Sequence, residues 1–208
     1  KSLGAKKKYG GLTKVVNGNP VWTGEVRLVE SALDLPLRWK KPARIFVNSM
    51  SDLFHEDVPD EWIDRIFAVM ALAPGHSFLI LTKRPGRMRK YLTTSNQYDI
   101  PLEDRERRDD IALEALAISR ETRPNGELWF TENEALIQPD RWPLPNVWLG
   151  VSVEDQARAD ERIPILLDTP AAVRFISAEP LLGPVAFRNG WVRAGIFGPH
   201  PELAGLDW

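Results

Sequence analysis

The chain has 208 residues, with 27 Lys or Arg against 29 Asp or Glu, and its formal net charge is −2 at pH 7. This balance gives no general electrostatic attraction to nucleic acids or anionic membranes. No apolar run approaches the roughly 20 residues that a membrane-spanning helix needs. The absence of cysteine excludes disulfides, thiolate zinc sites and cysteine-held iron–sulfur clusters within this sequence. We therefore expect a globular protein of the cytoplasm, with a single domain over residues 1–208.

Both ends of the sequence differ from the usual ends of a domain. The first residue is Lys1, with no initiator methionine, and the last three are Leu206, Asp207 and Trp208. A natural terminus is more often polar and frayed than apolar. The sequence therefore predicts a domain truncated at both ends, and a natural short tail is the alternative at the C-terminus.

Four segments are predicted as strands because they are short apolar runs rich in β-branched and aromatic residues. They are residues 43–48, 77–82, 146–152 and 173–177. Their apolar residues are almost continuous rather than alternating. This pattern is typical of strands that are buried on both faces, as in a parallel sheet covered by helices.

Helices are predicted between these strands. Residues 59–61 suit a first helical turn, because proline is tolerated there and two carboxylates complement the helix dipole. Further helices are expected at residues 86–92, at residues 103–119 and from Glu154 onward, the last broken or kinked at Pro164.

Repeated alternation of strand and helix predicts a parallel sheet. The first and last strand-to-strand intervals each fit one βα unit of about 30 residues. The longer middle interval holds two units, or one unit with an insertion, and residues 121–145 are predicted as an irregular insertion. We expect an α/β domain with a parallel (β/α) barrel-like fold that is partial and of the TIM-barrel type, and an open doubly wound sheet is the alternative.

Polar and charged residues follow each of the four predicted strands. In parallel α/β folds the carboxyl ends of the strands share one crevice, so these exits are expected to meet. The candidate site residues there are Ser49, Asp52, Lys83, Arg84, Ser152, Glu154, Ser177 and Glu179. Because the two cations suit a phosphate or a carboxylate, the set predicts a binding site for a charged ligand.

Several candidates also have a structural interpretation that the sequence leaves open. Ser49 and Asp52 suit a turn or a helix cap, because such side chains bond nearby backbone groups. The two cations also suit a solvated surface, and Glu154 suits the N-terminus of the following helix. Glu179 favours function more strongly, since the following Pro180 restricts its backbone.

No metal site is predicted at residues 55–57. Residues 55–57 are His, Glu and Asp, but three adjacent residues cannot all face one ion. The sequence also has no glycine-rich phosphate loop, no Gly-x-Ser-x-Gly nucleophile elbow and no His-Glu-x-x-His motif.

Four segments resemble the characteristic motifs of one family of uncharacterised bacterial and bacteriophage proteins. They are RIFVNSMSDLFH (44–55), LTKRP (81–85) with Met88, NVWLGVSVE (146–154) and RFISAEPLLG (174–183). The resemblance extends from about Trp22 to Gly183. That family is similar to radical S-adenosylmethionine (SAM) enzymes, which have a partial (β/α) barrel and an N-terminal three-cysteine motif for a [4Fe–4S] cluster.

The resemblance implies SAM and a [4Fe–4S] cluster as cofactors of the intact protein. The six Ser, Asp and Glu candidates would line the SAM and substrate crevice. Lys83 and Arg84 would bind either the SAM carboxylate or a substrate phosphate. The chain departs from the family pattern because it has no cysteine, so we expect no cofactor in this chain and no activity from it alone.

Two other functions remain open at this stage. A basic cluster of Arg84, Arg87, Arg89 and Lys90 at helical spacing suits a phage-associated module that binds nucleic acid or a protein. A solvated helix face is the alternative for that cluster.

The second open function is a barrel enzyme that holds a divalent ion through Asp52, Glu154 and Glu179. Whatever the function, a barrel that lacks strands has open sheet edges. We therefore expect either a dimer formed through those edges or terminal segments that cover them.

Overall fold

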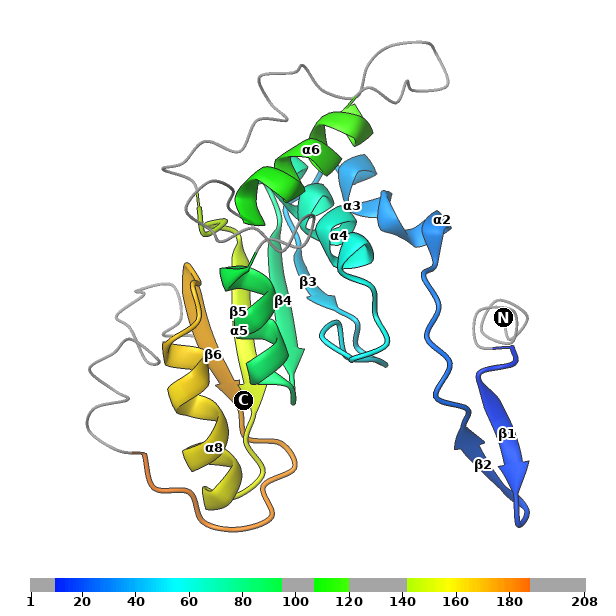
Figure 1. Cartoon of the computed structure of the whole chain (residues 1–208), viewed down its shortest axis with the longest axis vertical. Coiled ribbons are helices and arrows are strands. Elements are labelled where there is room, and N and C mark those ends of the chain that lie inside the picture. The colour runs from blue at the N-terminus through cyan, green and yellow to red at the C-terminus, as the bar shows by residue number, and fades with distance from the viewer. Residues whose placement is uncertain (1–9, 95–106, 120–141, 188–208) are drawn as a thin grey trace.

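The computed structural model describes residues 10–94, 107–119 and 142–187 (Figure 1). The strands are β1 (Thr13–Val16), β2 (Asn19–Trp22), β3 (Arg44–Val47), β4 (Ser77–Thr82), β5 (Val147–Ser152) and β6 (Val173–Ser177). The helices are α2 (Glu30–Leu33), α3 (Leu35–Arg38), α4 (Asp60–Leu72), α5 (Pro85–Thr93), α6 (Arg107–Ser119) and α8 (Gln156–Leu167). The expectations for the two chain ends, and for most of residues 121–145, lie outside the described residues.

The four predicted strands form one parallel sheet. Its order is β3-β4-β5-β6, so strands that follow one another in the chain are also neighbours in space. Each strand agrees with its predicted range to within one residue at either end. The described residues show no closure of this sheet into a barrel. The fold is therefore a mixed α/β fold with a four-stranded parallel sheet flanked by helices.

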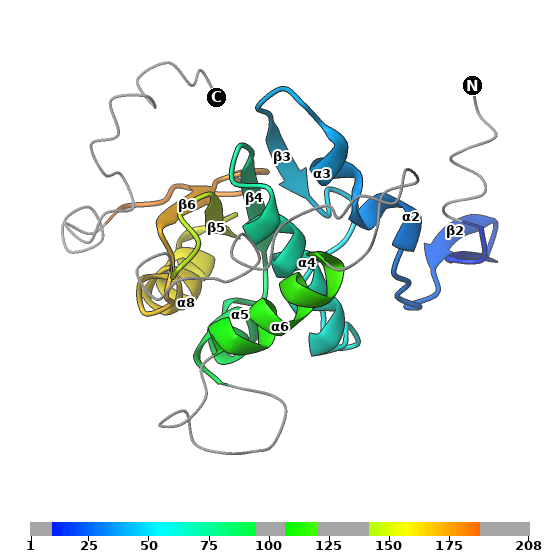
Figure 2. The same cartoon turned by 90° about the horizontal axis from the view of Figure 1, so that it is seen from above.

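Helices α4, α5 and α8 lie on one face of the sheet, and α6 packs on α4 (Figures 1 and 2). The core lies between this helical layer and the sheet. Alternate residues of β4 are fully buried there, including Phe78 and Ile80, and Val151 of β5 joins them. Within the described part, no helix is long and apolar enough to cross a membrane.

The predicted start of α4 is confirmed. Pro59 is its N-cap residue, and Asp60 and Glu61 lie in the first turn. The predicted break of α8 at Pro164 is wrong, because the helix continues through Pro164 to Leu167, and the alternative of a kink stays a prediction. The carbonyl of Pro164 accepts a hydrogen bond from Asp168 N at 3.1 Å. The side chains around the proline are buried in the core, and this burial outweighs the lost backbone donor.

A hairpin of β1 and β2 precedes the sheet and was not predicted. Thr13 pairs with Trp22 and Val16 with Asn19, which leaves a two-residue turn at Asn17 and Gly18. Both turn residues have positive φ, 51° and 81°. That backbone matches the twist of the flanking strands, and Asn-Gly is the dipeptide that adopts it most readily.

The sheet face opposite the helices is covered by no helix of the described part (Figure 2). The alternation of side chains places Phe46, Leu79 and Trp148 on this face at one level. Gly150 and Phe175 are paired at a second level. The ring of Phe175 lies over Gly150, because a Cβ at position 150 would be 2.6 Å from its Cε1 and closer still to two other ring atoms.

We expect Gly150→Ala to destabilise the protein by about 1–3 kcal/mol, since the added methyl overlaps the Phe175 ring. Urea unfolding followed by circular dichroism measures the loss. The double variant Gly150→Ala/Phe175→Leu is the control, because it removes the clashing ring. A double variant no more stable than Gly150→Ala alone would contradict this explanation.

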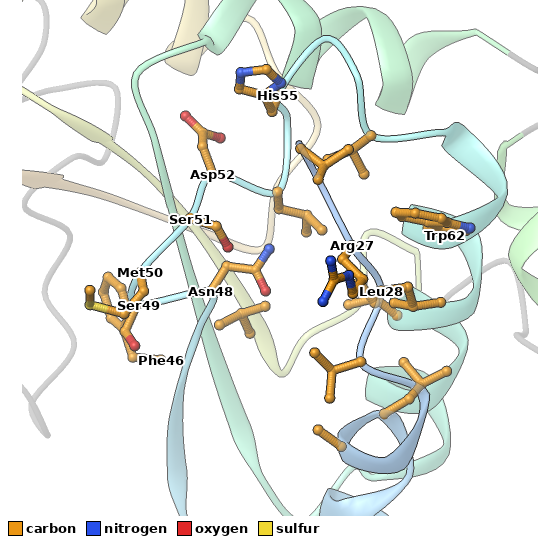
Figure 3. A pocket seen from close by; sticks show the side chains of 18 of the residues that line it. Arg27, Leu28, Phe46, Asn48, Ser49, Met50, Ser51, Asp52, His55 and Trp62 are labelled. Carbon is orange, nitrogen blue, oxygen red and sulfur yellow. The ribbon is translucent and has the colours of Figure 1, made fainter. Parts of the chain in front are cut away.

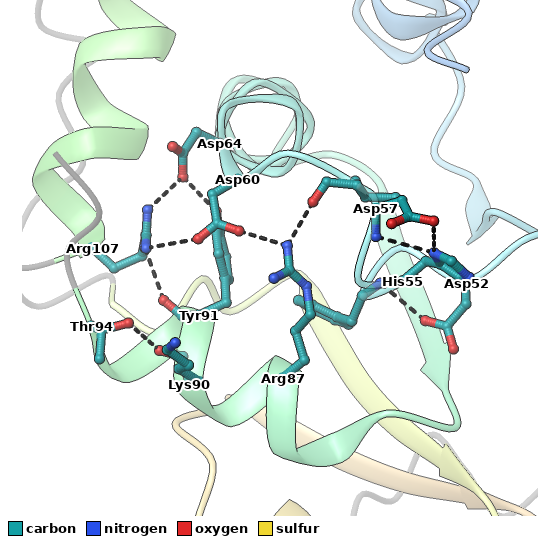
Figure 4. A network of polar contacts seen from close by, with 12 residues as sticks. Asp52, His55, Asp57, Asp60, Asp64, Arg87, Lys90, Tyr91, Thr94 and Arg107 are labelled. Atoms are coloured by element: carbon teal, nitrogen blue, oxygen red, sulfur yellow. Dashed lines mark hydrogen bonds and ion pairs between the residues drawn. The ribbon is translucent and has the colours of Figure 1, made fainter. Parts of the chain in front are cut away.

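A buried polar network joins α4, α5 and α6 on the helical side (Figure 4). Arg107 of α6 donates to Asp64 Oδ1 at 3.2 Å and to the carbonyl of Tyr91 at 2.9 Å. The Tyr91 hydroxyl donates to the same Asp64 oxygen at 2.7 Å. Asp60 pairs with Arg107 and, at 2.7 Å, with Arg87. Side chains that are far apart in the sequence therefore fix the relative positions of these three helices.

Asp64 gives this network a pH dependence. Burial raises the pKa of Asp64 from 3.8 to about 6, and the Tyr91 hydrogen bond and the Arg107 charge only partly oppose it. The folded protein therefore binds a proton at higher pH than the unfolded chain does. The free energy of unfolding rises as the pH falls from neutrality through 6, and the gain is complete below the unfolded pKa.

We expect the wild type to be more stable at pH 5.0 than at pH 7.5, by about 1.4 kcal/mol from Asp64. Urea unfolding at the two pH values measures the difference. Glu154 acts in the opposite direction, because its pKa lies below its ordinary value of 4.5, so it can only reduce the difference. Asp64→Asn removes the titrating group, so an equal pH effect in that variant would show that another group is responsible.

Candidate functional site

Asp52 links the exits of β3 and β4. Its Oδ1 accepts hydrogen bonds from Thr82 Oγ1 at 2.7 Å and from Phe54 N at 3.0 Å. Its Oδ2 accepts from Lys83 N at 3.2 Å and from Arg84 Nη1 at 3.1 Å. The bond to Phe54 N makes an Asx-type turn, so the structural interpretation of Asp52 is confirmed. The same carboxylate also holds the two candidate cations in place.

Lys83 links the exit of β4 to that of β5. Its Nζ lies 2.6 Å from Glu154 Oε1, and its own side chain is 56% exposed. The second carboxylate oxygen, Oε2, accepts a hydrogen bond from Arg162 Nη1 at 3.0 Å. Arg162 also donates to the carbonyl of Ser152 at 2.8 Å. A buried carboxylate thus lies between one buried and one exposed cation.

Glu154 is held in its ionised form. Burial raises the pKa of this carboxyl, but the Lys83 ammonium and the Arg162 guanidinium lower it by more, and the net shift is downward. Glu154 does not begin the next helix, because α8 starts at Gln156 and Asp155 is its N-cap. Asp155 Oδ1 accepts from Arg158 N at 2.8 Å. Glu154 directly precedes this N-cap, so the interpretation that it complements the helix N-terminus stays a prediction, while its carboxylate pairs with Lys83 and Arg162.

The exit of β6 joins the same edge through backbone hydrogen bonds. Val153 N donates to the carbonyl of Ser177 at 2.7 Å, and Leu182 N donates to the carbonyl of Glu154 at 2.7 Å. Ser177 pairs in register with Ser152. The structure therefore connects all four exits, in the order β3, β4, β5 and β6.

The remaining candidates occupy different environments. Ser152 is buried and Ser177 is half-buried. Glu179 is exposed in the loop after β6, and its carboxylate makes no hydrogen bond or ion pair within the described part of the chain. Ser49 is exposed in the loop after β3, where it lines a cavity. Asp52, Lys83, Arg84 and Glu154 are thus brought together, whereas Ser49 and Glu179 lie in the adjoining loops.

The basic cluster on α5 is largely paired with carboxylates. Arg84 pairs with Asp52, Arg87 with Asp60, and Arg89 with Asp168 at 2.9 Å. These pairs reduce the positive charge that phosphates would meet, and nucleic-acid binding stays a prediction. Across residues 10–94, 107–119 and 142–187, no three His, Cys, Asp or Glu side chains are grouped so that they could hold a metal ion.

A cavity of about 570 Å³ adjoins this edge between β3, α4 and the segment that precedes α2 (Figure 3). Asn48 and Arg27 line it, and neither was among the predicted site residues. Asn48 follows β3 with a φ of 58°, which is uncommon for a residue other than glycine. The sequence signal was present, because Asn is one of the few residues that adopt this backbone routinely.

The fold and this edge define an α/β protein whose parallel strands end in connected, charged loops. The chain belongs to the family described as Protein of unknown function (DUF5131), whose model matches residues 3–207. No curated protein and no solved structure is a match to the chain.

Proposed function

We propose that this chain is the ligand-binding portion of a radical-SAM-like enzyme, and that SAM and a substrate bind at the carboxyl edge of the sheet. The observation that supports the proposal is the unbroken series of contacts from Asp52 through Lys83 to Glu154 at that edge. In parallel α/β proteins this edge is where ligands bind.

Lys83 is the residue best suited to an anionic group of the ligand. Its side chain is 56% exposed, whereas the carboxylate with which it pairs is buried. Lys83 can therefore contact a ligand while Glu154 fixes its position. Arg84 is held by Asp52 in the neighbouring loop, at 3.1 Å, and presents a second cation. A carboxylate or a phosphate matches this pair.

The positively charged ammonium of the SAM amino-acid group also has candidate partners on this edge. Glu179 is exposed in the β6 exit loop and has a carboxylate that an ammonium group can approach. Ser152 and Ser177 lie side by side in register at the ends of β5 and β6. Together these residues bind and orient a zwitterionic ligand, which is the part that the protein contributes in cofactor-dependent chemistry.

The residues of this chain do not fit an iron–sulfur cluster. Such clusters are held by cysteine thiolates, and the 208 residues include no cysteine. The expectation that this chain holds no cofactor is therefore kept for the cluster alone. We assign the chain the binding and orientation of SAM, and we derive no reductive step from its residues.

Calorimetric titration of the chain with SAM tests the proposal, with inorganic phosphate as a second ligand. We expect SAM to bind, and Lys83→Ala to weaken binding by roughly tenfold or more, since a charge-assisted hydrogen bond is lost. Lys90→Ala is the matched control, because Lys90 is an exposed lysine of α5 away from the edge. Failure of SAM to bind, or equal weakening by both variants, would overturn the proposed site.

The enzymatic part of the proposal needs the protein expressed from its complete gene. Anaerobic reconstitution of that protein with iron and sulfide should give cluster absorbance and release 5′-deoxyadenosine from SAM. If SAM binds but neither signal appears, the edge is a SAM-binding site in a protein without radical chemistry.

A further inference from the structure

The cavity beside β3 has the size and the walls of a small-molecule site. Its volume of about 570 Å³ lies within the range of roughly 300–1,000 Å³ that is usual for such sites. Most of the wall is apolar, and it includes Leu28, Leu33, Val47, Trp62, Ile66 and Met70. An aromatic ring that entered the cavity would therefore be largely removed from water.

One polar group at the end of β3 is available to a ligand. The side-chain amide of Asn48 makes no hydrogen bond to any residue of the described part, although its backbone carbonyl accepts from Ser51 N at 3.0 Å. Figure 3 shows the amide directed from the end of β3 toward the segment that carries Arg27 and Leu28. The backbone of Asn48 is left-handed, with a φ of 58°, a conformation that Asn adopts more readily than most residues.

The charged groups around the cavity are already paired. Arg27 donates to Glu25 Oε1 at 2.8 Å and to the carbonyl of Gly10 at 3.2 Å. Asp52 accepts four hydrogen bonds at the β3–β4 exits. A charged ligand would have to compete with these pairs, whereas an uncharged ligand would not.

We propose that this cavity binds an uncharged aromatic amide or a heterocycle with an amide-like edge. The ring packs against the apolar wall, and the polar edge exchanges a donor and an acceptor with the Asn48 amide, which offers both. This site takes an uncharged ligand, whereas the carboxyl edge takes an anion. The inference therefore does not rest on the proposed function.

The three methionines of the chain provide a direct test. Met50 and Met70 line the cavity, whereas Met88 is fully buried in the core and does not. We expect titration with 2-naphthamide to shift the methyl NMR signals of Met50 and Met70 in methionine-labelled protein, and to leave Met88 unchanged. No shift at Met50 and Met70, or a larger shift at Met88, would overturn the proposal.

Two further comparisons test the chemistry of the ligand. Asn48→Gly keeps the left-handed backbone and removes the amide, so 2-naphthamide should bind about tenfold more weakly. Asn17→Gly is the matched control, because Asn17 has the same left-handed backbone, with a φ of 51°, and does not line the cavity, so this variant should bind as the wild type does. 2-Naphthoate has the same ring with a negative charge and should bind more weakly than the amide. Equal binding by Asn48→Gly, or tighter binding of 2-naphthoate, would overturn the assigned ligand class.

Discussion

Arg107→Met is expected to lower the free energy of unfolding by about 3–5 kcal/mol, because it removes the cation that pairs with the buried Asp64 carboxylate. The Arg107 side chain is 1% exposed and pairs with Asp60, Asp64 and Asp110. Its guanidinium carbon also lies 4.3 Å from the centre of the Tyr91 ring. A loss of this size is a large part of the stability of an ordinary domain. Urea unfolding followed by tryptophan fluorescence measures it.

A second substitution separates the buried charge from simple packing. In Arg107→Met/Asp64→Asn the carboxylate nearest the lost cation is neutral, and its side chain can still accept from the Tyr91 hydroxyl. We expect the double variant to recover a substantial part of the loss. Arg89→Met is the surface control, since its pair with Asp168 is largely exposed and such pairs contribute little. A double variant less stable than Arg107→Met would show that packing, not charge, dominates at this position.

The parallel sheet was predictable because each of its strands is a short, nearly continuous apolar run in the sequence. The runs at residues 77–82 and 173–177 are the observed bounds of β4 and β6. Apolar continuity over a few residues follows from burial on a parallel sheet, so it is visible in the sequence. The hairpin at Thr13–Val16 and Asn19–Trp22 has a different signal, the Asn-Gly turn, and its strands are exposed. Prediction from apolar runs therefore missed it.

At the carboxyl edge, the meeting of the four loops was predictable, but the side-chain pairs between them were not. The topology required the four exits to meet, and Lys83 and Glu154 do form an ion pair across them. Which side chain pairs with which depends on rotamers and loop paths that no spacing reveals. Arg162 contacts Glu154 from within α8, and no sequence pattern places the middle of that helix at the site.

The buried network was not predictable for a related reason. Asp64 looks like any polar residue of an amphipathic helix, and its raised pKa comes from burial under α6. The cavity beside β3 likewise depends on how the segment before α2 lies against α4. Tertiary packing of separate segments, and not local pattern, creates both features.

Asp52→Ala is the prediction that bears most directly on the candidate site. The variant removes the acceptor of four hydrogen bonds, and the Thr82 hydroxyl that loses its partner is attached to a buried residue. We expect a destabilisation of about 2–4 kcal/mol, since hydrogen bonds to a charged group are worth more than neutral ones. Asp57→Ala is the control, because Asp57 lies in the same loop with its side chain 63% exposed.

Asp52→Asn distinguishes the shape of this side chain from its charge. The amide oxygen can still accept from Thr82 Oγ1 and Phe54 N, but the amide nitrogen cannot accept from Lys83 N or from the Arg84 guanidinium. We therefore expect an intermediate loss of stability together with a weakened anion affinity at the carboxyl edge, measured by the same calorimetric titration. Asp52 positions the two cations and need not touch the ligand itself. If Asp52→Asn bound SAM as tightly as the wild type, the prediction would be contradicted, because Lys83 and Arg84 would then be positioned without the Asp52 charge.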